Sequence, residues 1–119
     1  MGYGQMVRDK RIEIEMSLRD LSAITGIDVG YLSRVEREST APPQSEEIIE
    51  AISEALKLTK AEQKTFKDQS SFDNERFPKD VAGKLKDVQG IPMLLRTVAN
   101  KKPSSDDIQD LIKYINEHY

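Results

Sequence analysis

The sequence predicts an all-α protein, with a five-helix domain in residues 1–70 followed by a small helical C-terminal segment. Two observations predict this fold class. Apolar residues recur at helical spacing almost throughout the chain, and no segment sustains the apolar-polar alternation that is typical of a strand. The 119 residues, of which 37% are hydrophobic and 33% charged, are enough for one domain of about 70 residues and a smaller appendage.

The first three predicted helices are short and follow one another closely. We expect them at about residues 3–15, 18–25 and 29–37. Ser17 is a suitable N-cap for the second helix, and Asp28 is a suitable N-cap for the third. The second helix should end at Gly26, because glycine readily adopts the left-handed conformation that follows a helix C-terminus.

Two further helices complete the predicted domain, at about residues 45–56 and 59–69. Pro42 and Pro43 prevent the third helix from continuing, and Ser45 opens the fourth. Thr59 and Glu62 stand three positions apart, as in a capping box at the start of the fifth helix. The inner face of the fourth helix is expected to consist of Ile48, Ile49, Ile52 and Leu56.

Residues 71–79 are predicted to be a linker, since they are polar and end just after Phe77-Pro78. Residues 80–119 then form the helical C-terminal segment, whose last helix begins after Ser104 or Ser105. Two apolar groups in this segment are either local core or a contact between subunits. They consist of Met93, Leu94, Leu95 and Val98, and of Ile108, Leu111, Ile112 and Ile115.

Composition excludes several classes of function. The chain has no cysteine, which excludes disulfides and thiolate sites and fits a cytoplasmic protein. No apolar run approaches the roughly 20 residues that span a bilayer, and no signal peptide is apparent, so we expect no membrane partner. The single histidine is His118, and no phosphate loop, carboxylate pair or metal-ligand spacing occurs. We therefore expect neither an enzyme nor a metal or cofactor.

The second and third predicted helices, joined through Gly26 and Ile27, have the layout of a helix-turn-helix, whose second helix enters the major groove of DNA. From Met16 to Glu36 the chain reads MSLRDLSAITGIDVGYLSRVE. This stretch resembles the xenobiotic-response-element family of DNA-binding transcriptional regulators, which includes Cro and the phage repressors. The resemblance extends over about residues 3–69 and implies a phage-repressor-like domain in residues 1–70.

The resemblance places base contacts on the third helix. The candidates are Asp28, Val29, Gly30, Tyr31, Ser33 and Arg34. Arg34 is the strongest candidate, because a guanidinium can bond both O6 and N7 of guanine, and a solvated surface arginine is the alternative. Val29 could touch a thymine methyl group, whereas Tyr31 could either contact the DNA backbone or pack half-buried.

Phosphate contacts are expected at the start of the second helix and after the third. The candidates are Ser17, Leu18, Arg19 and Arg37. The sequence departs from the family pattern at Leu18 and Val29, where family members often carry glutamines that contact phosphate and base. The resemblance also implies a buried ion pair between Arg11 and Glu36, with a structural role in setting the geometry of the domain.

The net charge of −3 means that any DNA-binding surface must be a local cluster. Residues 1–70 carry 10 Lys and Arg against 13 Asp and Glu, whereas residues 71–102 carry 7 against 4 and residues 103–119 carry 1 against 4. The basic side chains of the middle stretch could touch flanking phosphates, although a solvated helix face explains them more simply.

Two functions are consistent with these features. The first is a sequence-specific transcriptional regulator, a repressor, that binds a double-stranded DNA operator as a homodimer, since two half-sites one helical turn apart raise affinity. The second is an antitoxin or immunity-type regulator whose residues 71–119 bind a partner protein. A small neighbouring reading frame that is toxic on its own would favour the second.

Overall fold

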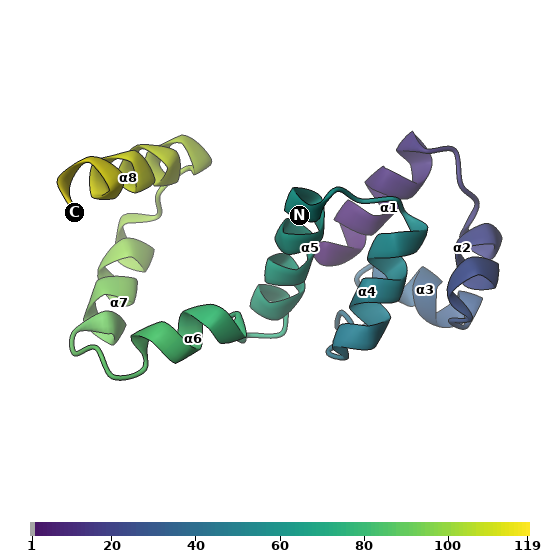
Figure 1. Ribbon diagram of the computed structural model, residues 1–119, viewed down its shortest axis with the longest axis horizontal. Helices are drawn as coiled ribbons and strands as arrows, with labels where there is room; N and C mark the ends of the chain where they lie inside the picture. Colours follow the sequence, from purple (N-terminus) through teal and green to yellow (C-terminus); the bar gives the residue numbers. More distant parts are fainter. Residues whose placement is uncertain (1) are drawn as a thin grey trace. The chain divides into compact units, whose positions relative to one another are not determined.

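The computed structural model describes residues 2–119 and confirms the all-α class, with eight helices and no strand in this range. The helices are α1 Tyr3–Glu13, α2 Leu18–Thr25, α3 Val29–Glu36, α4 Glu46–Ala55, α5 Lys60–Asp73, α6 Lys79–Leu85, α7 Ile91–Lys101 and α8 Ser105–His118 (Figure 1). The chain forms two compact units, Met1–Ala82 and Gly83–Tyr119. Among the described helices, none is long and apolar enough to cross a membrane.

Side-chain caps fix where several helices begin. The predicted capping box of Thr59 and Glu62 at the start of α5 is confirmed. Ser17 forms a second capping box at the start of α2, and Asp28 accepts a backbone N–H at the start of α3. Gly26 ends α2 with a φ of 75°, in the left-handed region that glycine adopts without strain. These local signals explain why the boundaries of α2 and the start of α3 follow from the sequence.

Helices α1 to α5 lie close together (Figure 1), and an apolar core fills the space between them. Its buried members are Tyr3, Val7, Leu21, Leu32, Val35, Ile52, Ala55, Leu56, Leu58 and Phe66. Helix α3 packs against both α1 and α2, and α5 packs against α1 and α4. Because burial of each large apolar side chain contributes about 1.5–3 kcal/mol, this core holds α3 in a fixed position on the domain.

Tyr3 lies at the centre of this core and carries a buried hydroxyl group without a hydrogen-bond partner among the described residues. Its ring meets that of Phe66 edge to face, with centroids 6.2 Å apart. Burial raises the pKa of Tyr3 above its ordinary value. The hydroxyl therefore stays protonated and loses its bonds to water on folding.

Tyr3→Phe is expected to raise the free energy of unfolding by about 1 kcal/mol, because it removes an unpaired buried polar group and keeps the aromatic ring. Urea denaturation followed by circular dichroism measures the change, with Tyr114→Phe on exposed α8 as the control. A less stable Tyr3→Phe variant would show that the hydroxyl has a partner in solution.

Helix α5 runs to Asp73, beyond the end predicted at Gln69, so residues 71–73 are helical although the sequence predicts a linker from residue 71. The reason is tertiary. The Ser70 hydroxyl donates to the carbonyl oxygen of Pro43 at 2.9 Å, and the Asn74 side chain donates to that of Pro42 at 3.1 Å. These polar side chains therefore hold the last turn of α5 against the loop that follows α3.

The end of α5 also caps the start of α1. The backbone N–H of Tyr3 donates to Asp73 Oδ2 at 2.7 Å, and Gln69 holds Asp73 Oδ1 at 2.8 Å. The backbone N–H of Gly2 donates to Glu38 Oε1 at 3.0 Å. The N-terminus of α1 thus depends on two carboxylates from distant parts of the chain.

Asp73→Ala is expected to lower the free energy of unfolding by about 1 kcal/mol, the usual cost of losing an N-terminal cap. Asp68→Ala, on the same helix, serves as the matched control. Thermal unfolding of both variants tests the effect. Equal melting temperatures would contradict a capping role for Asp73.

Candidate DNA-binding site

The turn between α2 and α3 is held by side-chain hydrogen bonds. The Thr25 hydroxyl donates to the carbonyl oxygen of Leu21 at 2.7 Å and accepts the N–H of Ile27 at 3.2 Å. The Ser22 hydroxyl donates to the carbonyl oxygen of Ile27. Together with Gly26 these contacts fix the angle at which α3 leaves α2.

Helix α3 has a buried face and an exposed face. Leu32, Val35 and Glu36 are buried against the domain. The exposed candidates for base contacts are Asp28, Val29 and Arg34. Val29 leaves 40% of its surface exposed, which is unusual for a valine in a small domain. The structure thus gathers three side chains of different chemistry on the outer side of α3.

The other three candidates on α3 are half-buried, namely Gly30, Tyr31 and Ser33. Tyr31 packs against the apolar core, so much of its ring has a structural role. The first turn of α3 has no side chain at Gly30. A Cβ added there would lie 3.0 Å from Asp28 Oδ2 and 3.5 Å from Arg34 Nη1, so the carboxylate and the guanidinium both flank the bare glycine.

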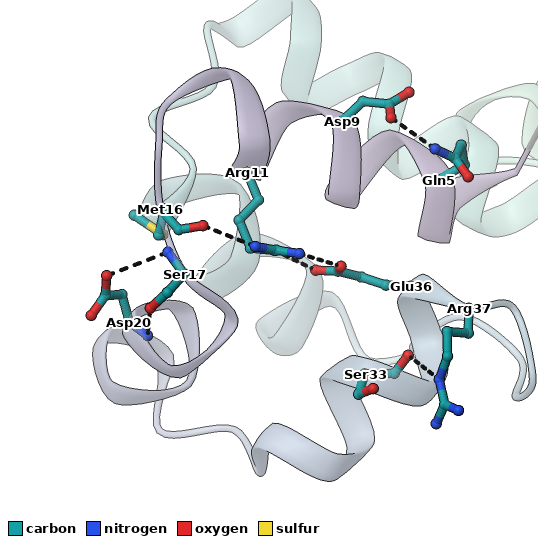
Figure 2. A network of polar contacts seen from close by, with 9 residues as sticks. All are labelled: Gln5, Asp9, Arg11, Met16, Ser17, Asp20, Ser33, Glu36 and Arg37. Atoms are coloured by element: carbon teal, nitrogen blue, oxygen red, sulfur yellow. Dashed lines mark hydrogen bonds and ion pairs between the residues drawn. The ribbon is translucent and has the colours of Figure 1, made fainter.

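The start of α2 offers fewer groups to a phosphate than the sequence suggests. The capping box uses the backbone N–H of Ser17 and that of Asp20, and it places the Asp20 carboxylate at the helix N-terminus (Figure 2). The side chain of Leu18 is half-buried against the core, so this residue can offer only its backbone N–H. Ser17 and Arg19 are exposed and remain available.

Arg37 follows α3 and is exposed. Its Nε donates to the carbonyl oxygen of Ser33 at 3.3 Å, so the side chain folds back along α3 (Figure 2). The terminal nitrogens of the guanidinium stay in solvent beside the C-terminal turn of α3. Arg37 therefore presents its positive charge to solvent beside the end of α3.

Arg11 of α1 and Glu36 of α3 form a bidentate ion pair between the two helices (Figure 2). Arg11 Nε and Nη2 donate to the two Glu36 carboxylate oxygens at 2.8 and 2.9 Å, and Nη1 donates to the carbonyl oxygen of Met16 at 2.9 Å. The hydrogen bond to Glu36 raises the pKa of Arg11 above its ordinary value, against the opposing effect of burial. One guanidinium thus joins α1, the end of α3 and the loop before α2.

Gly4 is a positioning residue that the sequence does not single out. It is buried in α1, and a Cβ added there would collide with the carbonyl oxygen of Val35 in α3. The two helices therefore approach so closely that only glycine fits between them. No local pattern indicates this contact, because α1 and α3 are distant in sequence.

These features define the class: a small helical domain that presents the second helix of a helix-turn-helix to solvent on a rigid support. Residues 7–63 match the family model described as helix-turn-helix, so this part of the chain is similar to that family. This match supports a DNA-binding transcription regulator in general. The comparisons with curated proteins and with solved structures gave no match.

Proposed function

We propose that this protein is a sequence-specific transcriptional repressor of the Cro and phage-repressor type, which inserts α3 into the major groove of an operator as a homodimer and acts in the cytoplasm. The observation that carries the proposal is the two-sided character of α3. Leu32 and Val35 anchor one face in the core, while Asp28, Val29 and Arg34 stand on the exposed side. Side chains on a fixed helix can read bases with little loss of entropy.

Each exposed group on α3 fits a particular feature of the groove. Arg34 can donate to O6 and N7 of guanine, Val29 can contact a thymine methyl group, and Asp28 can accept from N4 of cytosine. Gly30 lets the helix backbone approach the bases closely. Ser33 and the edge of Tyr31 flank this reading surface, which is defined by Asp28, Val29, Gly30 and Arg34.

Phosphate contacts orient the domain on the duplex in this proposal. Ser17 and Arg19 contribute their side chains, and Leu18 contributes its backbone N–H at the start of α2. Arg37 contributes its terminal guanidinium nitrogens on the far side of the reading surface. These groups set the register, and occupancy of the operator then blocks polymerase.

Arg34→Ala is expected to weaken binding to the operator by about 1–3 kcal/mol, roughly 5- to 150-fold, and to relax discrimination at one base pair. Fluorescence anisotropy with the chain's own upstream DNA, repeated across salt concentrations, measures both effects. Arg19→Ala should instead weaken all sequences alike and reduce the salt slope by about 1. Lys64→Ala on α5 is the matched control. A folded protein without specific binding at any salt would contradict the proposal.

An antitoxin or immunity-type regulator is the second candidate, and the exposed apolar side chains of α7 and α8 favour it. Leu94 and Ile112 leave 54% and 46% of their surfaces exposed, as expected for a region that binds a protein. A small neighbouring reading frame that is toxic alone, and is neutralised by this chain, would support this function over that of a plain repressor.

A further inference from the structure

The second unit, residues 83–119, exposes apolar side chains on both of its long helices, and none of its described residues is buried. The α7 face is defined as Ile91, Leu94, Leu95 and Val98, of which Leu94 and Leu95 are exposed and the other two are half-buried. The α8 stripe is defined as Ile108, Leu111, Ile112 and Ile115, of which Ile108 is half-buried and the other three are exposed. Each set follows helical spacing, so each helix has one apolar side that another surface can cover.

Five of the eight side chains of these two faces are exposed within a single chain, and none is buried. Leu95 on α7 is 42% exposed, and Leu111 and Ile115 on α8 are 41% and 47% exposed. Full burial of such side chains contributes about 1.5–3 kcal/mol each. A surface that covers these helices would therefore add to the hydrophobic stabilisation of the unit.

The two halves of the unit carry opposite charge. Residues 83–102, which contain α7, have 5 Lys and Arg against 1 Asp and Glu, whereas residues 103–119, which contain α8, have 1 against 4. A partner with a strong net charge would be attracted by one half and repelled by the other. A second copy of the unit is attracted by both halves when α7 of each copy meets α8 of the other.

We propose that the second unit binds a second copy of itself, with the α8 stripe of each copy packed on the α7 face of the other. Two-fold symmetry forms the same contact twice, which doubles the buried apolar area. The alternative arrangement, with α7 on α7 and α8 on α8, is disfavoured by charge repulsion. It would place one basic half against the other basic half, and one acidic half against the other acidic half. This interface gives the homodimer of the proposed function its structure, and in that respect the inference rests on the proposed function.

Sedimentation equilibrium of the full chain without DNA tests the association. We expect twice the mass of one chain at high concentration and a weaker dimer at high salt. Ile112→Asp, on the α8 stripe, is expected to abolish the doubled mass. Gln109→Asp, on the same helix outside the stripe, is the matched control and should leave it. Circular dichroism and thermal unfolding show that the first unit of each variant remains folded.

Single cysteines identify which helices meet, because the chain has no cysteine of its own. A copy with Val98→Cys mixed with a copy with Ile112→Cys is expected to form a mixed disulfide in excess over either homodimer. Met93→Cys, which lies on the other side of α7 and is 67% exposed, is the matched control for Val98→Cys and should give little cross-linking.

Three results would overturn the proposal. A single-chain mass at all concentrations excludes the second copy. Dominant homodimer disulfides from Val98→Cys or from Ile112→Cys alone show like-with-like pairing. In a chain that carries both Val98→Cys and Ile112→Cys, a disulfide within the monomer and no disulfide-linked dimer would show that α8 packs on α7 of its own chain. None of these measurements involves DNA, so a single-chain mass would overturn this interface whether or not the protein binds an operator.

Discussion

Alanine in place of Gly4 is expected to lower the free energy of unfolding of the helix-turn-helix domain by about 3 kcal/mol or more. The added Cβ would collide with the carbonyl oxygen of Val35 and lie 3.0 Å from its carbonyl carbon. A backbone carbonyl cannot rotate away as the end of a flexible side chain can, so α1 and α3 must separate. The separation disturbs Tyr3 and Val7, which are fully buried on either side of Gly4.

Urea denaturation measures this loss, and Gly83→Ala is the matched control. Gly83 is also helical, but a Cβ added there meets no atom within 4 Å. Alanine at position 83 should therefore leave stability unchanged or raise it by up to about 1 kcal/mol through its higher helix propensity. If Gly4→Ala were as stable as the wild type, the close approach of α1 and α3 would not exist in solution.

Local signals explain why so much of the fold follows from the sequence. The bounds of α2 depend on Ser17 at one end and Gly26 at the other, and both act within a few residues of themselves. The start of α5 depends on Thr59 and Glu62, which bond to each other's backbone. Caps of this kind need no knowledge of the tertiary structure, so they can be identified in the sequence alone.

Features that depend on distant contacts could not be predicted. Asp73 caps Tyr3 across 70 residues, and no sequence pattern connects the two. The same holds for Ser70, whose burial against Pro43 extends α5 into a polar stretch that otherwise has the composition of a linker. The requirement for glycine at position 4 likewise arises only when α3 packs on α1.

In the candidate site, too, local features could be predicted from the sequence and features that depend on distant contacts could not. Helical spacing separates Leu32 and Val35 from the outer residues of α3, and the motif points to Arg34 on the outer side. Spacing leaves open whether Tyr31 contacts DNA or packs half-buried, because its packing against the core depends on how the helices meet. Spacing also does not show that the Leu18 side chain packs against the core, so that only its backbone N–H could contact a phosphate.

Removal of one partner of the Arg11–Glu36 pair is expected to cost about 3–5 kcal/mol of unfolding free energy. In Glu36→Ala, Arg11 loses both of its bonds to the carboxylate and keeps only the carbonyl oxygen of Met16. The guanidinium side chain is only 15% exposed, so water cannot fully replace the lost bonds. Chemical denaturation measures the cost, with Glu13→Ala on the exposed surface of α1 as the control.

The double variant Arg11→Met with Glu36→Leu separates the two roles of the pair. Apolar side chains of similar size often replace a buried ion pair without net loss, so the double variant is expected to be more stable than either single variant. The carbonyl oxygen of Met16 then lacks its donor, which limits the recovery by about 1–3 kcal/mol. Operator affinity measured on the same protein tests orientation, because Glu36 lies at the end of α3. A stable double variant with weakened binding would mean that the pair orients the reading surface, whereas strictly additive losses of stability would contradict any coupling between Arg11 and Glu36.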